Sequence, residues 1–186
     1  MRYKKRLRTS RLLLRRWRAK DKYDLHEYAK LDTVGPSAGW APHKDLAESA
    51  RIIRQFLASP GTYAIVYKAS GKVIGSIGFH FTSVCRDVPD ERSVEIGYVL
   101  SPDYWGQGFV PEAVRACLRH AFEDLRMDAV WCGCFDTNER SRRVIEKCGF
   151  VYGYDKAAKL EPLGGIEVIE KIYKMTRERF LELYPR

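Results

Sequence analysis

A glycine-rich turn immediately before a predicted helix is the segment of this sequence with the clearest chemical potential. Residues 104–113 read YWGQGFVPEA, in which Gly106 and Gly108 precede Pro111 and Glu112. A helix N-terminus carries unpaired N–H groups and the positive end of the helix dipole, and glycine lets an anion approach the main chain. The spacing therefore indicates a cradle for a diphosphate. A tight strand-to-helix turn without a ligand explains the same glycines, and neither the P-loop nor the Rossmann motif is present.

The segments that must position this turn have a mixed α/β order. Apolar and β-branched runs predict seven strands, at residues 11–17, 62–68, 72–81, 93–100, 128–135, 151–157 and 166–175. Helical spacing predicts helices at residues 21–31, 44–59, 109 to about 125, 138–150 and from Arg177 onward. We expect Asp21 to cap the first helix, and Gly149 to end the fourth in a left-handed conformation. We also expect the second and third strands to form a hairpin, and a second strand pair to follow after the loop at 85–92.

Length and composition predict one domain that spans residues 1–186. The chain has 186 residues, of which 45% are hydrophobic, enough for a single substantial core. No run approaches the ~18 consecutive apolar residues of a membrane helix, and the basic N-terminus is too charged for a signal peptide. We therefore expect a cytoplasmic protein without a membrane segment.

The five cysteines predict buried, reduced thiols. They are an odd number in a chain that is too long to need disulfide bonds for its stability. The sequence WCGCF around Cys132 and Cys134 has the C-x-C form of some metal sites. No second cysteine pair or histidine cluster follows at zinc-finger spacing, so we expect no metal.

Positive charge is concentrated at the N-terminus. The formal net charge is +9. Residues 1–20 hold ten of the 33 Lys and Arg residues and no Asp or Glu. The remaining residues hold 23 Lys and Arg against 24 Asp and Glu, a net charge of −1. Such a basic arm is suited to bind RNA, a phosphate group or an acidic protein surface. The alternative interpretation is a solvated arm with the outward face of a first strand.

The segment VEIGYVLSPDYWGQGFVPEA at 94–113, followed by NERSRRVIEKCGF at 138–150, resembles the GCN5-related N-acetyltransferase (GNAT) superfamily. Within it, the pattern is similar to the branch of RimJ- and RimL-type ribosomal-protein N-acetyltransferases. The resemblance extends from RLLLRRW near the N-terminus to YKMTRERF near the C-terminus. It implies a single GNAT-type α/β domain, with a mixed, mostly antiparallel sheet of about seven strands flanked by helices. In this fold the fourth and fifth strands splay apart, and acetyl-CoA lies in the gap.

The resemblance implies which residues bind the cofactor. The family phosphate motif, [QR]-x-x-G-x-[GA], falls on six consecutive residues, in which Trp105 and Val110 depart from the usual types. The end of the fourth strand is expected to offer its backbone to pantetheine, and a motif asparagine to contact the cofactor. That asparagine is equally suited to cap the helix that follows it. The expected cofactor-binding residues are Tyr98, Val99, Leu100, Trp105, Gly106, Gln107, Gly108, Phe109, Val110 and Asn138.

Two residues are the candidate catalytic groups. The family often uses a glutamate of the fourth strand as base, which here matches Glu95, and strand alternation puts Glu95, Gly97 and Val99 on one face. A salt-bridged glutamate at the rim is the alternative. The usual proton-donating tyrosine is replaced by Ile145, and the resemblance implies instead that Ser141 lies near the CoA sulfur. A small helix residue without a catalytic role is the alternative there.

The acceptor side is expected to involve Trp40 and His43, in the glycine- and proline-rich loop at 34–43, together with His80. A structural loop and a core histidine are the alternatives. The resemblance implies acetyl transfer from acetyl-CoA to a primary amine, with the α-amino group of a protein, ribosomal proteins among them, as the expected acceptor. A small-molecule amine such as a polyamine or an antibiotic is the alternative acceptor. A non-catalytic module that binds CoA and RNA is the alternative of a different class, and a monomer and a homodimer both fit the sequence.

Overall fold

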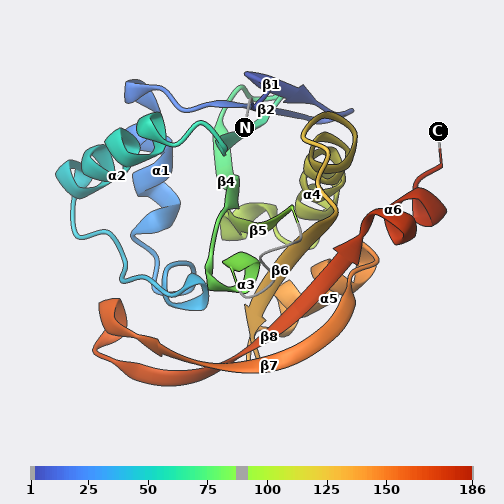
Figure 1. Ribbon diagram of the computed structural model, residues 1–186. Coiled ribbons are helices and arrows are strands. Elements are labelled where there is room, and N and C mark those ends of the chain that lie inside the picture. Colours follow the sequence, from blue (N-terminus) through green and yellow to red (C-terminus); the bar gives the residue numbers. More distant parts are fainter. Residues whose placement is uncertain (1–2, 87–91, 186) are drawn as a thin grey trace.

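The computed structural model describes residues 3–86 and 92–185, and it contains one mixed sheet between two groups of helices (Figure 1). The sheet has the order β1-β2-β3-β4-β5-β6-β8-β7. Its strands are β1 (Arg6–Arg8), β2 (Leu12–Arg16), β3 (Thr62–Tyr67), β4 (Val73–His80), β5 (Ser93–Leu100), β6 (Ala129–Phe135), β7 (Val151–Leu160) and β8 (Ile166–Thr176). The helices are α1 (Lys22–Ala29), α2 (Leu46–Ala58), α3 (Ser83–Arg86), α4 (Phe109–Arg119), α5 (Glu139–Lys147) and α6 (Arg177–Leu183).

All seven predicted strands are present, and one further strand was not predicted. Strand β1 pairs antiparallel with β2 and contributes only Leu7 to the core. Because β1 has only three residues, its sequence is too short to show the alternation of apolar and polar residues that predicts a strand. The helix α3 was also not predicted. It begins just before the expected loop at 85–92, and residues 87–91 of that loop lie outside the described part of the chain. The predicted hairpin of β3 and β4 is confirmed, and β4 also pairs antiparallel with β5.

The sheet divides between β5 and β6, the only parallel neighbours among the described strands. Their pairing covers three positions and ends where Glu95 faces Trp131. Beyond this point β5 stays paired with β4 as far as Leu100, while β6 stays paired with β8 as far as Phe135. The two strands therefore diverge, as the GNAT resemblance predicted for its fourth and fifth strands.

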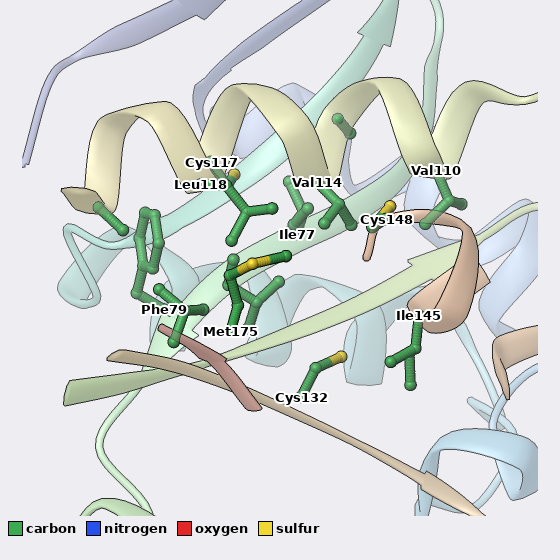
Figure 2. Close-up of a cluster of buried hydrophobic side chains, with 14 of the residues drawn as sticks. Ile77, Phe79, Val110, Val114, Cys117, Leu118, Cys132, Ile145, Cys148 and Met175 are labelled. Atoms are coloured by element: carbon green, nitrogen blue, oxygen red, sulfur yellow. The ribbon is translucent and has the colours of Figure 1, made fainter. Parts of the chain in front are cut away.

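The helix α4 packs on one face of the sheet and supplies the larger core, while α1 and α2 cover the other face (Figure 1). Figure 2 shows the apolar side of α4 directed toward the strands, with Val114 and Leu118 above Ile77 of β4. This amphipathic packing fixes where the N-terminal end of α4 lies relative to the split. All five cysteines are free and buried, as predicted: Cys85, Cys117, Cys132, Cys134 and Cys148.

Several charges of the basic arm are neutralised within the fold. Lys4 pairs with Asp124 at 2.6 Å, and the buried guanidinium of Arg15 pairs with Asp21 at 2.6 Å. The expectation that Asp21 caps α1 is wrong. Asp21 occupies the N-cap position, but its carboxylate accepts hydrogen bonds from Arg15 and from the backbone N–H of Arg18.

In the described part of the chain, no helix has both the length and the apolar character needed to cross a membrane.

Candidate active site

A cleft of about 920 Å³ opens where β5 and β6 diverge. It extends from the turn before α4 to the segment between α1 and α2, so it joins both halves of the predicted site. Gln107 is the predicted site residue that does not line it; its side chain is exposed and donates to the carbonyl of Asp103. The predicted residues that line the cleft are Trp40, His43, His80, Glu95, Tyr98, Val99, Leu100, Trp105, Gly106, Gly108, Phe109, Val110, Asn138 and Ser141.

The turn before α4 requires both of its glycines. Gly106 and Gly108 have φ angles of 73° and 75°, a left-handed conformation that residues with a side chain rarely adopt. Gly108 is the N-cap of α4, so the first N–H groups of the helix face the cleft end without a capping side chain. The side chains of Phe109 and Val110 point away from the turn into the core, where both are buried, so Val110 does not crowd the turn.

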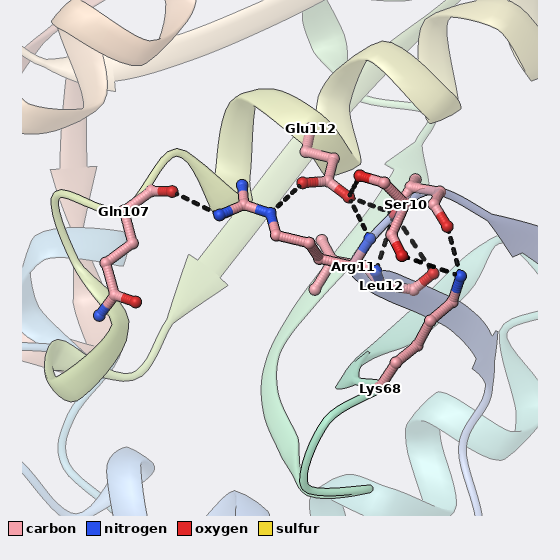
Figure 3. Close-up of polar contacts among 7 residues, drawn as sticks. Ser10, Arg11, Leu12, Lys68, Gln107 and Glu112 are labelled. Carbon is pink, nitrogen blue, oxygen red and sulfur yellow. Dashed lines mark hydrogen bonds and ion pairs between the residues drawn. The ribbon is translucent and has the colours of Figure 1, made fainter.

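Arg11 ties the N-terminal arm to this turn (Figure 3). Its guanidinium donates to the Glu112 carboxylate at 2.7 Å and to the Gln107 carbonyl at 2.9 Å, and lies 4.2 Å from the Phe109 ring centre. Partial burial opposes ionisation of Glu112, but hydrogen bonds from Thr9, Arg11 and Ser10 outweigh it and lower the pKa of Glu112 to about 2. Sequence reasoning missed this cluster, because its members lie about a hundred residues apart in the chain.

The helix α5 adds positive charge to the same end of the cleft. Arg140, Arg143 and Lys147 line it, and their spacing of three and four residues puts them on one helix face. The Arg140 guanidinium lies 4.0 Å from the ring centre of Trp105, whose indole N–H donates to the Leu100 carbonyl at 2.9 Å. These three cations were not among the predicted site residues, although their helical spacing was a usable signal.

Asn138 caps α5 and also reaches across the cleft. Its Oδ1 accepts from the backbone N–H of Ser141 at 3.1 Å, which confirms the capping interpretation of this residue. Its Nδ2 donates to the Ser37 carbonyl at 3.1 Å, in the segment between α1 and α2. The same side chain thus fixes the start of α5 and links it to the expected acceptor loop.

Tyr98 and Ser141 form a hydroxyl pair on the α5 side of β5. The Tyr98 hydroxyl lies 2.8 Å from Ser141 Oγ, and burial raises the pKa of Tyr98 well above its usual value. The phenol therefore stays protonated. Ile145, at the position where the family resemblance implies a tyrosine, is buried in the core, so the hydroxyl beside Ser141 comes from the strand instead. Sequence reasoning assigned Tyr98 through its backbone and missed this side-chain contact.

Glu95 and His80 lie on the opposite face of the sheet, as alternation along β5 predicts. They face each other in the β4–β5 register, and the next pair on the same face of the sheet is Gly78 with Gly97. A Cβ atom at either glycine would lie 3.3 Å from the His80 ring, so the glycine pair makes room for the imidazole. The His80 side chain is partly exposed to the cleft and partly covered by protein. Its partial burial lowers the pKa of His80, and the negative charge of Glu95 reduces that shift.

A second carboxylate reaches this face from β8. Glu170 lines the cleft, and a Cβ atom at Gly133 of β6 would lie only 2.5 Å from Glu170 Oε1, so the glycine allows the carboxylate to lie against the strand. Burial, and then the charge of Glu95, raise the pKa of Glu170. Sequence reasoning missed Glu170, because only the strand register across β6 and β8 brings it to Glu95.

The far end of the cleft is formed by the segment between α1 and α2. The rings of Trp40 and His43 are 5.2 Å apart, and His43 Nδ1 lies 2.9 Å from Ser49 Oγ. Burial lowers the pKa of His43, as do the nearby charges of His26 and Arg51, while Glu48 opposes the shift.

Among the residues that the structure describes, no group of His, Cys, Asp and Glu side chains could hold a metal ion.

These features define a class of acyl-CoA-dependent transferases: a mixed sheet that splits between two parallel strands, and a glycine turn at a helix N-terminus at one end of the split. The family model described as "Acetyltransferase (GNAT) domain" matches residues 11–151, about three quarters of the chain. The chain belongs to the GNAT acetyltransferase family. It is accordingly an acyltransferase that uses acetyl-CoA as its cosubstrate for N-acetylation.

Individual relatives agree with this family. The "Uncharacterized N-acetyltransferase YoaA" of Bacillus subtilis is 28% identical over 149 residues, which are 77% of this chain and 81% of YoaA. A GNAT-family acetyltransferase structure from Bacillus anthracis superposes with a TM-score of 0.81 at 24% identity, over 93% of this chain and 99% of that one. The ribosomal-protein-S5-alanine acetyltransferase of Vibrio fischeri superposes with a TM-score of 0.71 at 16% identity, over 93% and 97% of the two chains. The two structures establish the shared fold.

Proposed function

We propose that this enzyme transfers an acetyl group directly from acetyl-CoA to the α-amino group of a protein or peptide, without a covalent enzyme intermediate. One observation carries the proposal: Glu95 and the Tyr98–Ser141 pair lie on opposite faces of β5 where the split opens. A proton acceptor on one side and a proton donor on the other are what aminolysis of a thioester requires.

The residues around the split fit the cofactor. The bare backbone at Gly106 and Gly108, at the N-terminus of α4, would hold the diphosphate, with Arg140 and Lys147 adding positive charge. Beyond Glu95, the edge of β5 that faces β6 is released from pairing, so it would bind the pantetheine amides as an added strand does. Acetyl-CoA supplies the activated acetyl group when it is bound there.

The side chains divide the proton transfers between the two faces of β5. Glu95 takes a proton from the incoming ammonium, directly or through a water, which frees the amine to attack the carbonyl carbon. A β5 backbone N–H at the split stabilises the charge that develops on the carbonyl oxygen. As the carbon–sulfur bond breaks, Ser141 Oγ donates a hydrogen bond or a proton to the thiolate. The protonated Tyr98 hydroxyl, 2.8 Å from Ser141 Oγ, keeps that donor oriented.

The acceptor assignment draws on several features together. The sequence resembles the RimJ and RimL branch, and the fold is shared with an enzyme named for the alanine of ribosomal protein S5. Trp40 and the buried His43 form an aromatic wall at the far end of a cleft of about 920 Å³, a volume that suits a peptide segment beside acetyl-CoA. Ribosomal proteins are the proposed acceptors, and the cytoplasm, which holds both acetyl-CoA and ribosomes, is the proposed compartment.

The test measures thiol release from acetyl-CoA with amidated hexapeptides that begin with Ala or Ser, with spermidine as a small-molecule acceptor. We expect the peptides to be preferred, mass spectrometry to find the acetyl group on the α-nitrogen, and Glu95→Gln to lower kcat by about 100-fold or more. A preference for spermidine would favour the small-molecule alternative. The absence of thiol release with every amine, together with acetyl-CoA binding, would contradict an enzymatic role and favour a binding module.

A further inference from the structure

Glu170 and Glu95 belong to different strands but face the same side of the sheet. Glu95 pairs with Trp131 in the β5–β6 register, Trp131 pairs with Lys174 of β8, and Glu170 lies four residues from Lys174. Alternation therefore puts both carboxylates on the face covered by α1 and α2. Both line the cleft, one on each side of the split.

Glycines shape the floor beneath these polar groups. Gly78, Gly97 and Gly133 come from three neighbouring strands, β4, β5 and β6. A Cβ atom at Gly133 would lie 2.5 Å from Glu170 and displace the carboxylate, whereas one at Gly78 or Gly97 would lie 3.3 Å from the His80 ring and crowd it. The backbone thus leaves space for a histidine and a carboxylate beside Glu95, at the point where the sheet divides.

We propose that Glu95 and Glu170 together receive the acceptor as an ammonium ion and select amines that carry no carboxylate on the adjacent carbon. This inference rests on the proposed acetyl transfer and narrows its acceptor class. A peptide α-amine or a polyamine brings only positive charge toward the pair, whereas a free amino acid brings its own carboxylate to within a few ångströms of two others. Like charges in a partly desolvated cleft repel strongly, so free amino acids are excluded.

The surrounding charges set how this selection depends on pH. The charge of Glu95 on β5 acts on Glu170, and Lys156 of β7, its register partner, opposes that effect; His80 of β4 lines the same cleft. Cys132 and Cys134 of β6 are buried thiols with raised pKa values, so they stay neutral. Across the cleft, α2 contributes Glu48 and Arg51, which pair with each other at 3.2 Å, and His43 lies just before α2.

The raised pKa of Glu170 makes it gain a proton before an ordinary glutamate does as the pH falls. Protonation reduces the charge of the pair, and the rejection of carboxylates should weaken with it. Selectivity is therefore expected to be greatest near neutral pH and to decline toward pH 5.

The experiment compares alaninamide with alanine, which share one amine and differ only in the adjacent carboxylate. The first readout is the rise in Tm that each probe causes in the presence of saturating CoA, which needs no turnover. The second is kcat/KM for thiol release from acetyl-CoA. We expect alaninamide to raise the Tm and alanine not to do so, and a preference for alaninamide of at least about 100-fold in kcat/KM.

The variant Glu170→Gln should reduce that preference to below about 10-fold, while Glu170→Asp, which keeps the charge, should retain most of it. Glu167→Gln is the matched control, because Glu167 lies on the same strand but is exposed and does not line the cleft. Equal treatment of both probes by the wild type would overturn the inference. So would an unchanged preference in Glu170→Gln, or an equal loss in Glu167→Gln. If neither probe is acetylated, the proposed transfer fails, and the Tm comparison still decides whether the pair selects amines.

Discussion

Tyr98 and Glu95 lie on opposite faces of one strand, which separates the two chemical roles that we propose for them. They are three residues apart on β5 and therefore point to opposite faces, Glu95 toward His80 and Tyr98 toward Ser141. The chain carries Ile145 where the family resemblance implies a proton-donating tyrosine, and Tyr98 brings a phenol to Ser141 from another element. In the proposed mechanism, this hydroxyl pair stabilises the departing thiolate in place of that tyrosine.

At the residue scale, removing one hydroxyl of this pair should slow transfer without weakening the cofactor complex. We expect Ser141→Ala to lower kcat by about 10- to 100-fold and Tyr98→Phe by about 10-fold, because each removes a hydrogen bond used as the thiolate leaves. The Kd of acetyl-CoA should change by less than about threefold. Steady-state kinetics and calorimetry measure both quantities, and Tyr152→Phe, on the exposed strand β7, is the control. A weaker Kd with unchanged kcat would assign the pair to binding alone.

The next scale is that of the element, where α4 depends on a residue from the N-terminal arm. Glu112, in the first turn of the helix, is held by Thr9, Ser10 and Arg11, and Arg11 also holds the turn that begins the helix (Figure 3). A carboxylate in the first helical turn is stabilised by the dipole as well. The position of the proposed diphosphate cradle is therefore coupled to the packing of β2.

The pH dependence of stability tests this coupling. The pKa of Glu112 is lowered from 4.5 to about 2, so its ionised form stabilises the fold above about pH 4.5, and this contribution is lost as the pH falls toward 2. We expect Glu112→Gln to lower the free energy of unfolding at pH 7 by about 2 kcal/mol, which is a Tm loss of about 4 to 8 °C. The difference between variant and wild type should largely vanish near pH 2.

Thermal unfolding at pH 7 and near pH 2 measures this difference. Glu123→Gln is the control, since its partner Arg119 is 3.9 Å away at an exposed site and should contribute little. A destabilisation by Glu112→Gln that is equally large at both pH values would show that shape, and not charge, holds the arm to α4.

At the scale of the whole molecule, sequence reasoning found what is local and missed what depends on register. Seven strands follow from apolar alternation and from turn residues, whereas β1 is too short to show a pattern. The glycine turn and Asn138 belong to two short motifs, at 94–113 and 138–150, whose residue types and spacing could predict them. Arg11 and Glu170 could not be predicted, because Arg11 reaches the turn from the segment just before β2, about a hundred residues away in the chain, and Glu170 of β8 reaches the split across β6.

The central claim is that acetyl-CoA binds in the split with its diphosphate on the turn at Gly106 and Gly108, and calorimetric titration of acetyl-CoA tests it most directly. Glu at position 108 would place a bulky anion where the diphosphate lies, so we expect Gly108→Glu to weaken binding by about 100-fold or more. The control is Gly71→Glu, since Gly71 has a similar φ of 72° in an exposed turn with no atoms near a Cβ. The account predicts wild-type affinity for Gly71→Glu and near loss of binding for Gly108→Glu. Equal affinity of Gly108→Glu and wild type would contradict it.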